Sequence, residues 1–103
     1  MIKIKEGDTA RTLTDTLLLD GSAIDLTGAT VVLVWRLPNG VVNRRSATIV
    51  DEEAGRVSYA PTIEDVGTAG RHALEWEITF AGGGVLTVPS SGYIQLVVAR
   101  DLG

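Results

Sequence analysis

The single histidine of the chain, His72, is the first residue whose chemistry needs an explanation. An imidazole can act as a catalytic base, but it then needs a nucleophile and a carboxylate that orients the ring. The sequence has no cysteine and no Gly-x-Ser-x-Gly motif that would present a serine nucleophile. His72 lies at the start of a segment whose alternate residues are apolar. We therefore interpret it as a structural residue whose ring nitrogen makes a hydrogen bond at a corner of the fold.

Acidic side chains gather in two places that invite comparison with calcium sites, Asp20 with Asp25 and the run 51–53. A Ca²⁺ ion takes roughly 6–8 oxygen ligands. Neither group has the Asp-x-Asp-x-Asp spacing that supplies several of them, so we interpret both as turn-forming, solvated acids and predict no metal site. Glu75 and Glu77 would lie about 7 Å apart on one strand face. We interpret this pair as solvated as well.

Motifs that bind cofactors or polyanions are also missing. The glycine run 82–84 is not followed by the Lys-Ser/Thr pair and helix of a phosphate-binding loop, so we interpret it as a hairpin connection. Nine basic residues stand against 13 acidic ones, which gives a net charge of −4. Arg44 and Arg45 form too small a basic patch for nucleic acid, although either could pair with an acidic partner surface. We expect no cofactor, no nucleic-acid partner and no catalytic activity.

Nothing in the sequence predicts a membrane partner or a secretory signal. No apolar run approaches the ~18 residues that indicate a membrane span. Residues 1–5 alternate apolar and charged side chains and offer no apolar signal region. The lack of cysteine excludes a disulfide framework, so packing alone must hold the fold.

Strands must position these residues, because composition and patterning are those of an all-β protein. Val, Ile and Thr supply 30 of the 103 residues, and 103 residues are enough for one domain, residues 1–103. Short runs of alternating apolar and polar residues recur between turns rich in Gly, Pro, Asn and Asp, a pattern typical of a sandwich or barrel. The predicted strands cover residues 2–5, 11–19, 30–37, 41–50, 56–60, 71–80, 85–88 and 93–100.

Two local details qualify this pattern. Asp15 falls on the same face of segment 11–19 as Leu13 and Leu17, an irregularity that a bulge or an edge position would resolve. The segment 61–65 predicts one helical turn, because proline and acidic residues favour a helix start.

Apolar side chains remain after the predicted core has been filled. In segment 30–37 the odd-numbered residues form the core face, which leaves Val32 and Val34 on the opposite face. In segment 93–100, Val97 and Ala99 likewise project away from the core. We expect the two strands to be near neighbours, so that Val32, Val34, Val97 and Ala99 form a surface for self-association or docking. The alternative is that these are scattered exposed side chains without a function.

The order of several short motifs resembles the immunoglobulin-like N-terminal domain of phage baseplate upper proteins, and this resemblance covers nearly the whole chain. It implies an immunoglobulin-like β-sandwich of seven to eight antiparallel strands. One departure is His72, because the family usually has a tyrosine at this corner. The motifs are Glu6-Gly7-Asp8-Thr9, Ile24-Asp25-Leu26-Thr27-Gly28-Ala29, Pro38-Asn39-Gly40, Ala69-Gly70-Arg71-His72 and Val88-Pro89-Ser90-Ser91-Gly92-Tyr93.

The resemblance implies a non-catalytic structural component of a phage or prophage tail or baseplate, made in the bacterial host cytoplasm and located in the virion. Its partners would be other tail or baseplate proteins, or further copies of itself. Family members carry long regions after this module, so the chain is expected to be either a stand-alone tail component or an excised domain. The alternative function is a carbohydrate- or cell-surface-binding module of the adhesin kind, although two Trp, two Tyr and one Phe supply few aromatic side chains for it.

Overall fold

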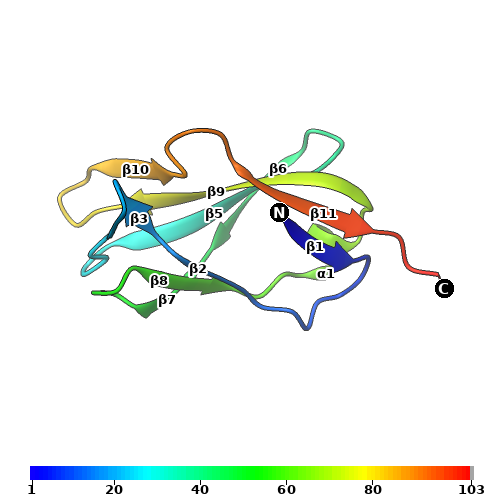
Figure 1. Cartoon of the computed structure of the whole chain (residues 1–103), viewed down its shortest axis with the longest axis horizontal. Helices are drawn as coiled ribbons and strands as arrows, with labels where there is room; N and C mark the ends of the chain where they lie inside the picture. Colours follow the sequence, from blue (N-terminus) through cyan, green and yellow to red (C-terminus); the bar gives the residue numbers. More distant parts are fainter. Residues whose placement is uncertain (103) are drawn as a thin grey trace.

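Two β-sheets packed face to face make up most of the structure, a computed structural model that describes residues 1–102 (Figure 1). The large sheet has the order β1-β11-β9-β5-β6, with β10 also paired to β9. Its strands are β1 (Ile2–Lys5), β5 (Thr30–Arg36), β6 (Val42–Ser46), β9 (Gly70–Thr79), β10 (Val85–Val88) and β11 (Ile94–Ala99). The small sheet consists of β2 (Leu13–Thr16), β8 (Arg56–Tyr59) and β7 (Thr48–Asp51), in that order. The short strands β3 (Leu18–Leu19) and β4 (Ser22–Ala23) form a separate pair, and the helical turn α1 (Ile63–Val66) follows β8.

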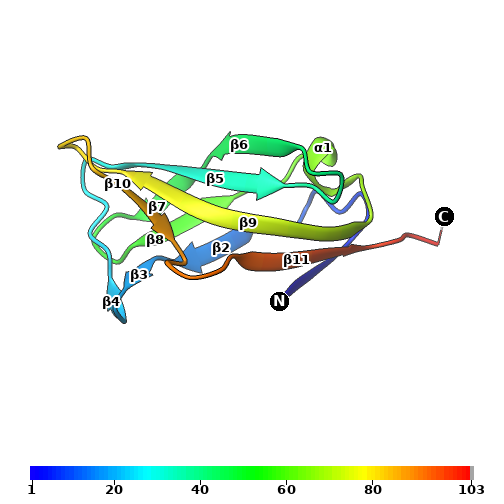
Figure 2. The ribbon, with the colours of Figure 1, turned by 90° about the horizontal axis from the view of Figure 1, so that it is seen from above.

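Strand β9 organises the large sheet, which Figure 2 shows with β6, β5, β9 and β11 side by side. It pairs antiparallel with β5 along seven residues and with β11 and β10 on its other side. Its buried residues alternate with half-buried ones from His72 to Ile78, which confirms the alternation predicted from the sequence. An all-β sandwich is therefore confirmed.

The prediction that all strands are antiparallel is wrong at one place. β1 runs parallel to β11, with Ile2 opposite Leu96 and Lys5 opposite Ala99. Strands that are consecutive in sequence can pair antiparallel through a tight turn, but β1 and β11 are separated by the whole chain and no turn sets their relative direction. The immunoglobulin-like strand arrangement stays a prediction.

Two predicted strands are each divided in the structure, and β4 lies outside every predicted strand, so that the described residues form eleven strands in place of seven or eight. Segment 41–50 leaves the large sheet after β6, and its continuation β7 joins the small sheet. Segment 11–19 is divided at Leu17, whose amide donates to the carbonyl of Gly55 and whose carbonyl accepts from Ile24. No glycine or proline marks either division, so the sequence could not show where the pairing partner changes.

Between the sheets lies one cluster of buried apolar side chains, including Trp35, Leu33 and Ile78, which are fully inaccessible. Burial of a Leu, Ile or Val side chain contributes about 1.5–3 kcal/mol relative to exposure, so this cluster is the main source of stability. The full cluster is Ile4, Leu13, Leu17, Ile24, Leu26, Val31, Leu33, Trp35, Leu37, Val57, Tyr59, Val66, Leu74, Trp76, Ile78, Val88, Leu96 and Val98.

Asp15 lies on β2, which is an edge strand of the small sheet. Its Oδ2 accepts a hydrogen bond from the indole nitrogen of Trp76 at 2.9 Å, and its Oδ1 accepts from the amide of Thr16 at 2.8 Å. The carboxylate thus satisfies a donor from the core and an amide of its own strand. The edge position explains why a charged residue interrupts the apolar face, with no bulge needed in β2.

In residues 1–102 no helix is long and apolar enough to cross a membrane.

Candidate functional site

The candidate surface is the outer face of the large sheet, formed by those side chains of β5, β9 and β11 that alternate with the buried ones. Val32, Val34 and Val97 lie on this face and are half-buried, whereas Ala99 is exposed. The predicted residues therefore share one face of one sheet. Their contribution to an interface stays a prediction.

Strand β9 separates the two pairs of predicted residues. Its register places Glu77 beside Val32, Glu75 beside Val34 and Arg71 beside Val97. β5 and β11 are consequently second neighbours, and the four apolar side chains do not touch as one patch. The face is better described as apolar side chains alternating with charged ones.

Charged residues on this face interact with each other. Glu77 forms an ion pair with Arg44 of β6, so it is not simply solvated as the sequence suggested. The guanidinium carbon of Arg36 lies 5.4 Å from the ring centroid of Tyr93, within the range of a cation–π contact. These contacts hold the side chain of Arg44 against Glu77 and that of Arg36 against Tyr93.

Two hollows lie next to the stacked pair Arg36 and Tyr93. One has a volume of about 230 Å³, and its rim includes Arg71 and Gln95. The other, of about 120 Å³, is lined also by Val34 and Val42. Arg36, Ala73 and Tyr93 border both hollows, so the two adjoin each other, and we call them together the arginine groove.

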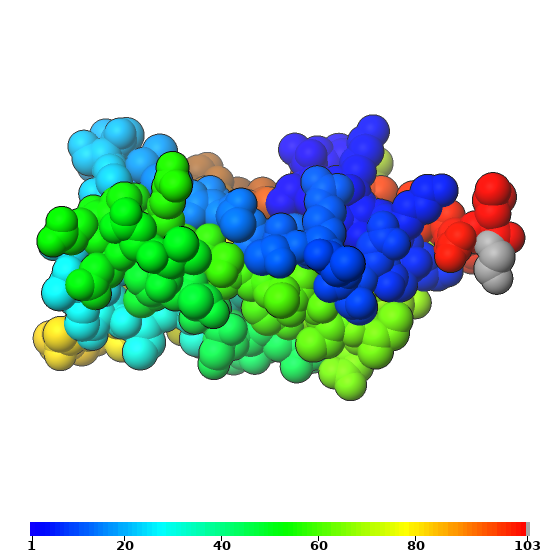
Figure 3. Space-filling view, turned by 90° about the horizontal axis from the view of Figure 1, so that it is seen from below, coloured from blue at the N-terminus to red at the C-terminus, as the bar shows by residue number. Residues whose placement is uncertain are grey.

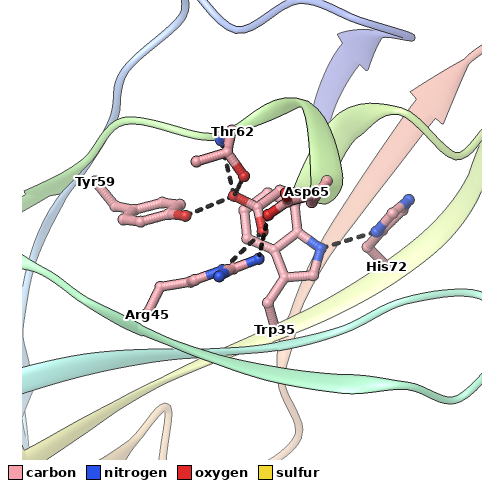
Figure 4. A network of polar contacts seen from close by, with 7 residues as sticks. Trp35, Arg45, Tyr59, Thr62, Asp65 and His72 are labelled. Carbon is pink, nitrogen blue, oxygen red and sulfur yellow. Dashed lines mark hydrogen bonds and ion pairs between the residues drawn. The ribbon is translucent and has the colours of Figure 1, made fainter.

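Beneath the outer face, a polar network fills the space between α1 and the large sheet (Figure 4). Its centre is Asp65, which has no exposed surface. The Oδ2 atom of Asp65 accepts from the Tyr59 hydroxyl at 2.5 Å, the Thr62 amide at 2.8 Å and the Thr62 hydroxyl at 3.2 Å. Its Oδ1 accepts from Nε of Arg45 at 3.1 Å. The carboxylate thus joins the start of α1 to β8 and β6.

The pKa values of Tyr59 and Arg45 are shifted by the burial of these two groups and by their contacts with Asp65. Burial raises the pKa of Tyr59 far above its usual value, and the hydrogen bond to Asp65 raises it further because that bond requires the protonated phenol. Burial lowers the pKa of Arg45, but the charge of Asp65, its hydrogen bond to Arg45 and smaller contributions from Tyr59 and Glu64 together outweigh burial and raise the pKa overall. At neutral pH the network therefore holds a protonated Tyr59 and a charged Arg45.

A second part of the network contains His72, which is 2% exposed. Its Nδ1 accepts from the indole nitrogen of Trp35 at 2.8 Å, and its Nε2 donates to the carbonyl of Thr68 at 2.9 Å. These two bonds require the tautomer with its proton on Nε2. The rings of Tyr59 and His72 also meet Trp35 edge-on, at centroid distances of 6.2 and 5.8 Å. The contacts of His72 are with a core side chain and the backbone, and its role as a structural corner residue stays a prediction.

The remaining candidate residues do not converge. Asp25 accepts from the amide and hydroxyl of Thr27, which lower its pKa, and Asp51 accepts from the amide of Ala54. Both are turn contacts at exposed acids. Within the described residues, no three His, Cys, Asp or Glu side chains gather as a metal would require.

Aromatic side chains bear on the carbohydrate alternative. Trp35 and Trp76 are 0% and 3% exposed, and Tyr59 is also buried. Phe80 is half-buried, and Tyr93 is 47% exposed with Arg36 against its ring. Over residues 1–102 the structure offers no row of exposed rings on which sugars could stack.

Sequence reasoning missed the role of Asp65 and the arginine groove. The spacing Thr62-x-x-Asp65 resembles a capping box and is a detectable signal, since the N3 carboxylate accepts from the amide of the residue before the helix. The sequence pattern places Arg45 with Arg44 in an exposed segment, but Arg45 points inward to Asp65 and Glu64. The two arginines pair within the chain, so the expectation that one meets a partner has no support here.

Comparisons with known proteins agree with the fold. The family model described as "BppU N-terminal domain" matches residues 1–88. The comparison with curated proteins gives no match. Eleven chains of known structure match, among them the N-terminal domain of phage TP901-1 ORF48. It has a TM-score of 0.75 and 15% sequence identity, and the alignment covers 96% of this chain and 84% of that one. At this identity the structural likeness shows a shared fold.

Proposed function

Because the chain belongs to the BppU N-terminal domain family, the family of baseplate upper protein N-terminal domains, we propose that it is a non-catalytic structural component of a phage tail or baseplate. The observation that carries the proposal is the family match over residues 1–88. The likeness to the TP901-1 domain, which extends over most of both chains, is consistent with it. The protein would act in the virion by protein–protein association after synthesis in the bacterial host.

The contacts of the buried polar side chains are those expected of structural residues. The buried polar groups of the described residues are occupied with one another, and every buried side-chain nitrogen or oxygen among them has a partner. Asp65 and His72 sit in closed networks that join strands and α1. We propose that His72 and Asp65 stabilise the fold and have no part in a reaction.

The outer face of the large sheet is the surface through which we propose that the domain associates. Val34 and Val97 are half-buried there, beside charged residues that would give an interface specificity. The small sheet exposes another face, seen in Figure 3, where β2 and the β7–β8 hairpin lie. A substitution on each face therefore gives a matched comparison.

Electron microscopy of gold-labelled particles tests the location. An antibody raised against this chain should label one end of the tail of purified virions, and labelling of heads alone, or of neither part, would contradict the proposal. For the surface, Val34→Glu should block incorporation into tails, whereas Thr14→Glu at an exposed position of β2 should not. Circular dichroism of both variants would show that each one is folded.

A further inference from the structure

The arginine groove has an uneven distribution of charge in a protein whose net charge is −4. Arg36 and Arg71 are both exposed at its larger hollow, and no Asp or Glu lines that hollow. Among the described residues, neither guanidinium makes an ion pair, in contrast to Arg44 and Arg45. Two planar guanidinium groups with a Gln95 amide nearby form a suitable receptor for carboxylates.

The smaller hollow of the groove has the opposite character. Val34 and Val42 line it together with Ala73 and the ring of Tyr93, and Val42 is 53% exposed. Glu75 stands at its border and would repel a second carboxylate there. A fitting ligand therefore has carboxylates at one end and an apolar side chain beside them.

One exposed segment of the chain itself has this composition. Val50 is 61% exposed and is followed by three exposed acidic residues, 51–53, at the turn between β7 and β8. We call residues 50–53 the acidic turn. It joins β7 and β8 of the small sheet (Figure 1), whereas the arginine groove is lined by residues on the outer face of the large sheet. A chain cannot place its own acidic turn in its own groove.

We infer that the arginine groove binds the acidic turn of a second copy of this chain, with carboxylates at Arg36 and Arg71 and Val50 against Val34 and Val42. This inference rests on the proposed associative role and names its occupant. The two contacting surfaces are different, so the contact is heterologous, and repeating it closes a ring or extends a filament. Nucleic acid is a poorer ligand, because Glu75 and Glu77 on the same face oppose a polyanion.

Charge reversal on the two surfaces tests this contact. The groove variant is Arg36→Glu with Arg71→Glu, and the turn variant is Glu52→Lys with Glu53→Lys, which keeps the Asp51 bond to Ala54. A matched control reverses Lys3 and Lys5 to Glu, with the same change in charge on exposed β1 residues outside the groove. All are measured by sedimentation velocity at low salt, with circular dichroism to verify folding.

The wild type and the lysine control should associate in a concentration-dependent way that high salt weakens, because exposed charges are screened. Each charge-reversed variant alone should associate at least about tenfold more weakly, which corresponds to about 1.4 kcal/mol. An equimolar mixture of groove and turn variants should recover association, since each supplies the complement of the other. A monomeric wild type overturns the inference, as does a mixture that stays monomeric or a groove variant that associates like the wild type.

Failure of this contact is distinguishable from failure of the proposed function. Sedimentation reports only on contacts between copies. The presence of the chain in tails reports on the virion role, and a chain that is found in tails but is monomeric in every sedimentation experiment would overturn only the groove contact.

Discussion

Replacement of Asp65 by asparagine should strongly destabilise the protein. The carboxylate has no exposed surface and accepts from Tyr59, Thr62 and Arg45. In the Asp65→Asn variant an amide NH₂ group takes the place of one carboxylate oxygen and faces donors, which leaves at least one buried donor without an acceptor. The substitution also leaves Arg45 without its buried counter-charge.

The magnitude follows from these contacts. Removal of one partner of a buried ion pair costs about 3–5 kcal/mol, and the lower end applies because the Arg45 side chain is 27% exposed. For a domain of this size, about 3 kcal/mol corresponds to a fall in Tm of about 12–15 °C. With a urea m-value of roughly 2 kcal/mol/M, the midpoint of unfolding should fall by about 1.5 M.

Urea titration followed by tryptophan fluorescence and by circular dichroism measures this change. Glu64→Gln is the matched control, because Glu64 also pairs with Arg45, at 3.5 Å, but its side chain is 73% exposed. That variant should change the free energy of unfolding by less than about 0.5 kcal/mol. The reasoning is refuted if Asp65→Asn is as stable as Glu64→Gln, since the buried network would then contribute nothing beyond an exposed pair.

Three further predictions test other parts of the structure. His72→Phe should lower the free energy of unfolding by about 1–3 kcal/mol, because the buried indole donor of Trp35 loses its acceptor. Urea titration should show this loss of stability in His72→Phe but not in His72→Gln, because the glutamine amide can accept the same bond. Folding raises the pKa of Tyr59, so the stabilisation from its protonated hydroxyl is complete below pH 10, the ordinary pKa of tyrosine, and is lost as the pH rises above 10. Urea midpoints measured from pH 8 to 11 should therefore fall at the alkaline end, and Tyr59→Phe should remove part of that fall. Gly55→Ala should lower the Tm in thermal melts much more than Gly40→Ala. Both glycines have positive φ angles, of 69° and 89°. However, a Cβ at Gly55 would lie 2.8 Å from a backbone oxygen, whereas a Cβ at Gly40 would have no atom within 4 Å.

Most of the sandwich could be predicted because its strands carry their own signal. The segment from His72 to Ile78 alternates buried and half-buried residues as its sequence pattern indicates, and Val31, Leu33 and Trp35 are buried as expected. The helical turn at residues 61–65 is confirmed in position, as α1 (Ile63–Val66). These features depend on residues close together in sequence, where period and turn chemistry are informative.

Features that depend on distant pairing could not be predicted. The parallel pairing of β1 with β11 joins the two ends of the chain, and the division of segment 41–50 depends on which sheet each half joins. Arg44 and Arg45 point to opposite faces because the register places Arg44 opposite Val34 and Arg45 opposite Leu33. A one-residue shift in this register would exchange their roles, and the sequence alone does not set it.

The same reason explains what was missed at the candidate surface. The arginine groove needs Arg36 from β5, Arg71 from β9 and Tyr93 before β11, which only the sheet order brings together. The alternation of side chains along each strand places Val32, Val34, Val97 and Ala99 on the face opposite the core, and that prediction agrees with their positions. The charged residues of β9 between them could be placed only once the register was known.

The central claim is that this chain is a building part of a phage tail, and its copy number in purified virions tests that claim most directly. Quantitative mass spectrometry with isotope-labelled peptides from this chain, referred to a tail protein of known copy number, should give a fixed number of copies per particle that survives high-salt washing. Peptides absent from the particles, or present at a variable trace level removed by washing, would contradict the account.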